Sequence, residues 1–357
     1  MQNNQAIPFN KENFKQVLSK EFALVIVISI PAALLADYLN IPLAWFLGPM
    51  LITSIVTLGG IKTKMPRLAL STVLIFLGLY IGNYIDQELF SQMHQWIWTS
   101  LIMLGYIVIS VLLVSKYLQK FSNYGKKTSV FSAAPGALGP LLILAEDEKS
   151  DLSQVATSHL IRLIIIITVF PFIVNSFYNS ENVEIIQTIE TEQSIYQFLI
   201  LLFFSIILVL FFDKLKVPAA LLAGTLVASG LLQISEIATY KLPPNIIDYC
   251  LLILGSSVGC RFADKTFNEI AKNALHSFVA TFFLVVLGLI AAWVASLVID
   301  KNFFTLLLSY CPGGIYEVAV IAIFFNLDPE FVSFHHIIRL LLILFIVPII
   351  LRILKSR

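Results

Sequence analysis

Hydrophobic residues dominate the chain in long runs, and short polar segments separate these runs. In the first part of the chain the runs predict membrane spans near residues 22–37, 42–60, 68–85, 95–115 and 154–178. In the second part they predict spans near 197–212, 217–234, 246–260, 275–299 and 334–354. Several runs approach or exceed the roughly 20 apolar residues that a helix needs to cross a bilayer. The pattern therefore predicts an all-α polytopic membrane protein.

Two further apolar segments, at 128–145 and 304–326, each contain a Pro-Gly pair. Proline removes a backbone donor and glycine adopts conformations that a helix does not use, so we expect each pair to break its helix. A broken helix inside a membrane must find other partners for its freed backbone groups. A simple kink would explain either break alone. Two breaks at matching positions are typical of a transport site.

The two halves of the chain share a set of residues at one spacing. A fixed offset of 177 residues joins Pro135 to Pro312, Asp151 to Asp328, His159 to His336, Arg162 to Arg339, and Pro171 to Pro348. Matches at one offset predict an internal duplication. We therefore expect a cytoplasmic N-terminal tail over 1–21, a membrane repeat over 22–180, an acidic linker over 181–196 and a second membrane repeat over 197–357.

Lysine and arginine residues favour one topology. If each half has about five transmembrane helices plus a re-entrant or discontinuous Pro-Gly segment, nearly all basic loop residues lie on one side of the membrane. Counting the broken segments as full crossings would place the acidic linker inside and the basic residues of 261–272 outside. An odd number of crossings in each half predicts two inverted repeats. Both termini then lie in the cytoplasm, and the protein lies in the cell (inner or plasma) membrane.

The composition narrows the classes of function. The chain is 58% hydrophobic and 13% charged, against about 25% charged residues in a soluble domain. Its net charge of +1 gives no basic surface, so we expect no direct nucleic-acid binding. The three cysteines lie in or beside apolar segments and are expected to be buried. The scattered histidines form no convincing ligand set, so we expect no metal, no cofactor and no enzymatic activity.

The two arginines are the main candidates for chemistry. Only 16 residues separate Arg162 from Asn179, about 24 Å of helix, which places the arginine within the hydrocarbon core or at its edge. His159 and His336 precede their arginines by three residues and share a helix face with them. Arginine suits an oxyanion, and histidine suits proton-linked coupling. Alternatively, the arginines reach the lipid headgroups or bind carbonyl groups freed by the breaks.

Glu317 has no counterpart, because Pro140 stands at the matching position. A buried glutamate exchanges a proton near neutral pH or pairs with an arginine.

Asp151 and Asp328 are interpreted as helix caps, and the Gly-x-x-x-Gly pairs at 78–82 and 255–259 need only helix packing. The candidate ligand or transport residues are therefore Pro135, Gly136, His159, Arg162, Pro312, Gly313, Gly314, Glu317, His336 and Arg339.

Three motifs resemble those of the AbrB-type (AbrB duplication) membrane protein family. They are Leu47-Gly48-Pro49-Met50, Pro312-Gly313-Gly314-Ile315-Tyr316-Glu317 and His336-Ile337-Ile338-Arg339. The resemblance extends from about residue 22 to residue 354. The first copy departs from it, since Ala137 and Pro140 stand where Gly314 and Glu317 do in the second. The resemblance implies the labels ammonia monooxygenase or regulator of gene expression, and neither follows from these residues.

The sequence favours two functions. The first is a secondary transporter or exporter of a small solute, an anion being one option, with ion coupling. The alternative is a membrane-resident regulator of gene expression that acts indirectly through signal sensing. The expected partners are a small-molecule or ion substrate and the lipid bilayer, and self-association into a homo-oligomer is left open.

Overall fold

The computed structural model describes residues 11–85, 87, 93–136, 138–178, 194–238, 240, 242–243, 245–263 and 265–355. Over these residues the chain forms 15 α-helices and one short 3-10 helix, η1 (Met93–Gln95), and no strand. The predicted all-α fold class is confirmed. The N-terminal tail up to residue 10 and most of the acidic linker lie outside the described residues. The rest of the tail contains a short helix, α1 (Lys11–Val17).

Six of the described helices are long and apolar enough to cross a membrane. They are α2 (Lys20–Tyr38), α6 (Trp96–Phe121), α9 (Leu152–Phe177), α10 (Ile195–Lys214), α13 (Phe267–Ser296) and α16 (Pro329–Lys355). The other four predicted spans form helices of 15 or 16 residues, namely α3 (Ala44–Leu58), α4 (Arg67–Gly82), α11 (Ala220–Ile234) and α12 (Asn245–Cys260). These apolar helices indicate a multi-pass membrane protein.

The chain divides into two compact units, and each unit takes helices from both halves of the sequence. Unit 1 comprises residues 1–91, 179–265 and 323–325, and unit 2 comprises residues 92–178, 266–322 and 326–357. The units and the predicted repeats are therefore different divisions of the chain. The inversion of one repeat relative to the other stays a prediction.

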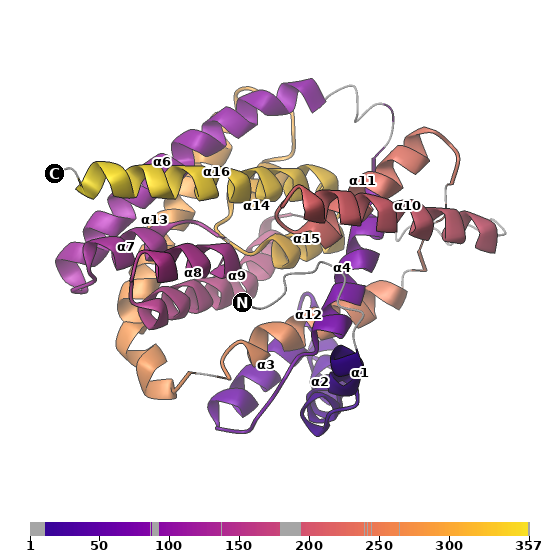
Figure 1. Ribbon diagram of the computed structural model, residues 1–357, viewed down its shortest axis with the longest axis horizontal. Coiled ribbons are helices and arrows are strands. Elements are labelled where there is room, and N and C mark those ends of the chain that lie inside the picture. The colour runs from indigo at the N-terminus through magenta and orange to yellow at the C-terminus, as the bar shows by residue number, and fades with distance from the viewer. Residues whose placement is uncertain are drawn as a thin grey trace. The chain divides into compact units, whose positions relative to one another are not determined.

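Unit 1 is built crosswise from the two halves. Helix α3 packs on α12, and α4 packs on α11 (Figure 1). Two glycines make each contact close: a Cβ atom built at Gly82 would lie 2.6 Å from the Leu226 carbonyl oxygen, and one at Gly259 would lie 2.7 Å from the Ser54 nitrogen. Small residues allow membrane helices to approach in this way. The packing interpretation of both Gly-x-x-x-Gly pairs is confirmed.

The outer helices of unit 1 repeat a second local pattern. Helix α2 packs on α3 and α10 packs on α11, with Gly48 against the Ala32 backbone and Gly224 against the Val209 backbone. The residues just before α3 and α11, Leu43 and Ala219, both have left-handed backbone conformations, with φ of 54° and 55°. The two halves therefore fold alike at these helix starts.

Unit 2 holds both Pro-Gly pairs, and each pair divides its segment into two short helices. They are α7 (Lys126–Ala133) with α8 (Leu138–Asp147), and α14 (Phe303–Tyr310) with α15 (Ile315–Phe324). The predicted helix breaks are confirmed. Helix α7 packs on α6 and α9, and α14 packs on α13 and α16. Figure 1 shows α16, in yellow, as one continuous helix. The unbroken helices α9 and α16 thus lie beside the breaks and carry the predicted arginines.

Candidate functional site

The backbone differs between the two breaks. In the first break, Gly136 has φ of +119°, a region that favours glycine. Its N–H group donates to the Ala134 carbonyl at 3.0 Å, so this break closes on itself. In the second, the Cys311 N–H donates to the Leu308 carbonyl at 3.2 Å. Gly60 and Gly136 are the described glycines with positive φ, so Gly313 and Gly314 turn the chain in another way.

Helix α9 presents the first histidine–arginine pair to the first broken helix. His159 and Arg162 lie one turn apart and are both buried. The His159 Nε2 atom is 2.9 Å from the Phe131 carbonyl oxygen of α7. Because a carbonyl only accepts, Nε2 carries the hydrogen, and Nδ1 accepts from Arg162 Nη2 at 2.6 Å. This histidine is neutral and holds the arginine against α7.

Helix α16 presents the second pair with the same connections. His336 Nε2 donates to the Leu308 carbonyl of α14 at 2.9 Å, and Arg339 Nη2 donates to His336 Nδ1 at 3.0 Å. Phe131 and Leu308 are themselves 177 positions apart. The two histidines therefore donate to backbone carbonyls at matching positions of the duplication.

Arg339 makes additional contacts that join the two breaks. Its Nη1 donates to the Cys311 carbonyl, and its Nη2 donates to the Gly313 carbonyl at 2.7 Å. The guanidinium also lies against the first break, since a Cβ atom on Gly136 would be 3.0 Å from Nη2. Of the alternatives derived from the sequence, the binding of freed carbonyl groups is the one that describes Arg339.

Arg162 is placed differently. Within the described part of the chain, its side chain makes one hydrogen bond, to His159. Its electrostatic neighbours are Tyr106, Arg339 and Cys311, and none of these is a carboxylate. With only 3% of its surface exposed, Arg162 is enclosed by protein and does not extend to a headgroup region. Buried charge is costly unless it is compensated, so two neighbouring guanidinium groups favour an added anion.

Tyr106 is a site residue that the sequence reasoning missed. It lies on α6, is 4% exposed, packs its ring 6.2 Å from that of Tyr310 and has Arg162 and Arg339 among its charged neighbours. Its hydroxyl donates to the Leu284 carbonyl at 3.4 Å, a long hydrogen bond. The sequence signal was only a tyrosine in the middle of an apolar span. The duplication could not reveal it, because the matching position holds Phe283.

Glu317 is buried in the first turn of α15. Its carboxylate faces Gly314, where a Cβ atom would lie 3.4 Å from Oε1. Gly314 accepts the first helical hydrogen bond, from the Val318 N–H at 3.1 Å, so Glu317 is the third residue of the helix. An acidic side chain at that place interacts favourably with the helix N-terminus. This position supports a local role in starting α15.

The remaining candidates form the breaks themselves. Pro135 and Pro312 follow the last turns of α7 and α14. Gly313 lies against α9, since its Cβ atom would be 3.2 Å from the Ile166 side chain. The structure thus brings Gly136, Gly313 and both arginine–histidine pairs together within unit 2.

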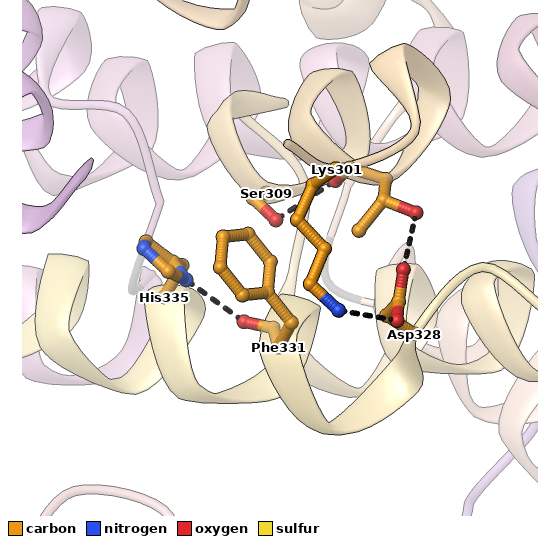
Figure 2. A network of polar contacts seen from close by, with 6 residues as sticks. Lys301, Ser309, Asp328, Phe331 and His335 are labelled. Carbon is orange, nitrogen blue, oxygen red and sulfur yellow. Dashed lines mark hydrogen bonds and ion pairs between the residues drawn. The ribbon is translucent and has the colours of Figure 1, made fainter. Parts of the chain in front are cut away.

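The two aspartates have structural partners. Asp151 caps α9, because its Oδ1 accepts the Gln154 N–H at 3.0 Å, so the capping interpretation is confirmed there. Asp328 precedes α16, and its two oxygens accept from Lys301 at 2.8 Å and Thr305 at 3.0 Å (Figure 2). Asp328 therefore fixes the start of α14 to the start of α16.

His335 lies next to the second pair in sequence, yet its ring has a separate set of partners. Its Nδ1 hydrogen bonds to the Phe331 carbonyl at 2.9 Å, and its Nε2 contacts Thr99 Oγ1 at 2.7 Å (Figure 2 shows the first of these). The Phe331 ring lies 4.1 Å away. Both ring nitrogens are engaged, so His335 is a satisfied packing residue.

Residues 2–86 and 45–355 match the family described as "Transition state regulatory protein AbrB". The chain belongs to this family. A protein of Escherichia coli (strain K12) named "Putative regulator AbrB" is 22% identical over 94% of this chain and 97% of its own length. "Uncharacterized protein YhjN" of Bacillus subtilis (strain 168) is 20% identical over 90% of each chain. No solved structure matches. The family resemblance seen in the sequence motifs is confirmed.

Proposed function

We propose that this AbrB-family protein is a secondary transporter or exporter of a small anionic solute, coupled to an ion. One observation carries the proposal. Arg162 and Arg339 lie buried beside two broken helices and interact with one another, and the electrostatic neighbours of Arg162 include no carboxylate among the described residues. A buried positive site of this kind is completed by an anion. Broken helices next to it are the usual setting of a transport site in membrane proteins.

The histidines act as positioning groups in this proposal. Each uses its Nε2–H group on a carbonyl and its Nδ1 lone pair on an arginine. Protonation at Nδ1 would break the hydrogen bond to the arginine and place two cations side by side. The proposal therefore gives the histidines a positioning role, and the proton-coupling role expected from the sequence stays a prediction.

The test is transport by the full-length protein in liposomes, across a panel of carboxylates, inorganic oxyanions and halides under proton or sodium gradients. Wild type is compared with the double variant Arg162→Ala, Arg339→Ala. The matched control is Arg352→Ala, since Arg352 is exposed on the same helix as Arg339. Uptake by wild type and control, with loss in the double variant, is expected. Folded wild-type protein that moves no solute of the panel refutes the proposal.

The second candidate is a membrane-resident regulator of gene expression that acts indirectly, by sensing a signal. The names of the family and of the Escherichia coli relative favour it. The segment before the first long helix, with α1, would be the contact for an effector protein. Deletion of residues 1–17 should then abolish a regulatory phenotype while the protein remains in the membrane. An unchanged phenotype excludes action through that segment.

A further inference from the structure

We infer that the two arginines have different tasks: Arg162, together with Tyr106, binds a small monocarboxylate, and Arg339 holds the second break in place. This rests on the proposed function, because it names the class of solute at the same site. The observations that separate the two arginines are their hydrogen bonds and the backbone of the break beside each one.

Arg339 is engaged by the protein itself. Its terminal nitrogens donate to the Cys311 and Gly313 carbonyls and to His336 Nδ1. Those carbonyls are left without a helical partner by the Pro-Gly break. Unpaired buried carbonyls are unfavourable, so Arg339 is a structural part of the break. Its positive charge faces the carbonyl dipoles at the C-terminal end of α14, which partly offset it.

Arg162 makes no such hydrogen bonds to the first break in the described part of the chain, and there the backbone itself supplies the partner of one of the two matching carbonyls. The positions matching Cys311 and Gly313 are Ala134 and Gly136. The Ala134 carbonyl accepts the Gly136 N–H at 3.0 Å in a three-residue turn centred on Pro135. Arg162 therefore keeps its Nε and Nη1 donors for another group. Nη2 has a second N–H besides the one given to His159, and this N–H lies parallel to one on Nε or on Nη1 along an edge of the guanidinium, the arrangement that binds both oxygens of a carboxylate.

Tyr106 supplies a second donor at the same site, since its ring lies 6.2 Å from that of Tyr310, the last residue of α14 before the second break. Its hydroxyl donates to the Leu284 carbonyl over a long 3.4 Å, and Arg162 is among its charged neighbours. Rotation of the O–H bond would direct it to an anion without displacing a short hydrogen bond. One negative charge compensates Arg162, while Arg339 remains with the break carbonyls. A single charge on two oxygens describes a monocarboxylate better than a dianion.

The experiment measures acetate binding to the full-length protein in detergent, by equilibrium binding of labelled acetate and by thermal unfolding at constant ionic strength. Arg162→Met should lose at least tenfold in acetate affinity and unfold at or above the wild-type temperature, because an uncompensated buried charge is removed. Tyr106→Phe should lose about five- to tenfold. Arg339→Lys should unfold at a lower temperature but keep acetate affinity within about threefold. Arg352→Met and Tyr249→Phe, at exposed positions, are the controls.

Two results overturn the inference. One is unchanged acetate affinity in Arg162→Met and Tyr106→Phe. The other is stabilisation of the wild type by sulfate and not by acetate, which would assign the site to a dianion. Its failure is distinguishable from failure of the proposed function. A protein that transports some other solute without binding acetate is a transporter with a different site chemistry. A protein that binds acetate through Arg162 but moves no solute retains the site and loses the transport function.

Discussion

Substitution of Gly136 by alanine should destabilise unit 2 at the first break. The residue has φ of +119°, and an L-residue held in such a region costs about 1–3 kcal/mol. The new Cβ atom would lie 3.0 Å from Arg339 Nη2 and 3.2 Å from Nε, so the guanidinium must move by a few tenths of an ångström. Its bonds to the Cys311 and Gly313 carbonyls then weaken, which adds about 1 kcal/mol. The expected total is about 2–4 kcal/mol.

The measurement is thermal unfolding of the purified full-length protein in detergent. At about 2–4 °C for each kcal/mol in domains of 150–250 residues, the midpoint should fall by at least roughly 4 °C. Gly139→Ala is the matched control, three residues along the chain. A Cβ atom there has no described neighbour within 4 Å, and alanine in a helix is about 1 kcal/mol better than glycine. It should be neutral or stabilising.

A double-mutant cycle separates the two causes. Combining Gly136→Ala with Arg339→Met removes the steric contact but not the backbone strain. The double variant should therefore be destabilised by less than the sum of the two single variants. Equal unfolding midpoints for Gly136→Ala and Gly139→Ala would refute the reasoning. Full additivity in the cycle would show that the arginine does not lie against this glycine.

Three further predictions concern other parts of the molecule. Gly259→Leu should prevent α12 from packing on α3 and reduce the yield of folded protein, whereas Gly105→Leu, at a site with no described neighbour within 4 Å, should not. His336→Ala should destabilise by about 1–3 kcal/mol, because the Leu308 carbonyl and Arg339 each lose a buried partner; an unfolding midpoint equal to wild type would contradict this. Single cysteines at Lys126 and Asn182, in a cysteine-free background, should react with membrane-impermeant reagents from opposite sides, and at Lys241 from the same side as 182. Labelling of 126 and 182 from one side would exclude the inverted repeats.

Much of the fold follows from residues that act locally. The Pro-Gly pairs end α7 and α14 wherever the neighbouring helices lie, because proline and glycine change the backbone itself. The paired arginines and histidines are recognisable because three residues on a helix place them on one face. The packing glycines are recognisable because a missing side chain is useful mainly at a close contact.

The sequence could not separate the roles of the two arginines. That difference depends on the turn centred on Pro135, in which the Ala134 carbonyl accepts the Gly136 N–H within the break. It also depends on Arg339 meeting carbonyls across a turn. Both are matters of tertiary geometry, and residue types matched at one spacing suggested equal roles. Tyr106 was overlooked for a related reason, since its importance comes from neighbours on other helices.

The crosswise pairing in unit 1 has a consequence for biosynthesis. Helix α3 ends at Leu58, and its partner α12 begins only at Asn245. Chains grow at about 5–20 residues each second, so roughly 10–40 s pass between the two. During that interval the face of α3 that carries Thr53 and Ser54 awaits the helix that will cover it. The emerging chain must therefore tolerate a half-built membrane domain, and the second half of the gene completes the fold of the first.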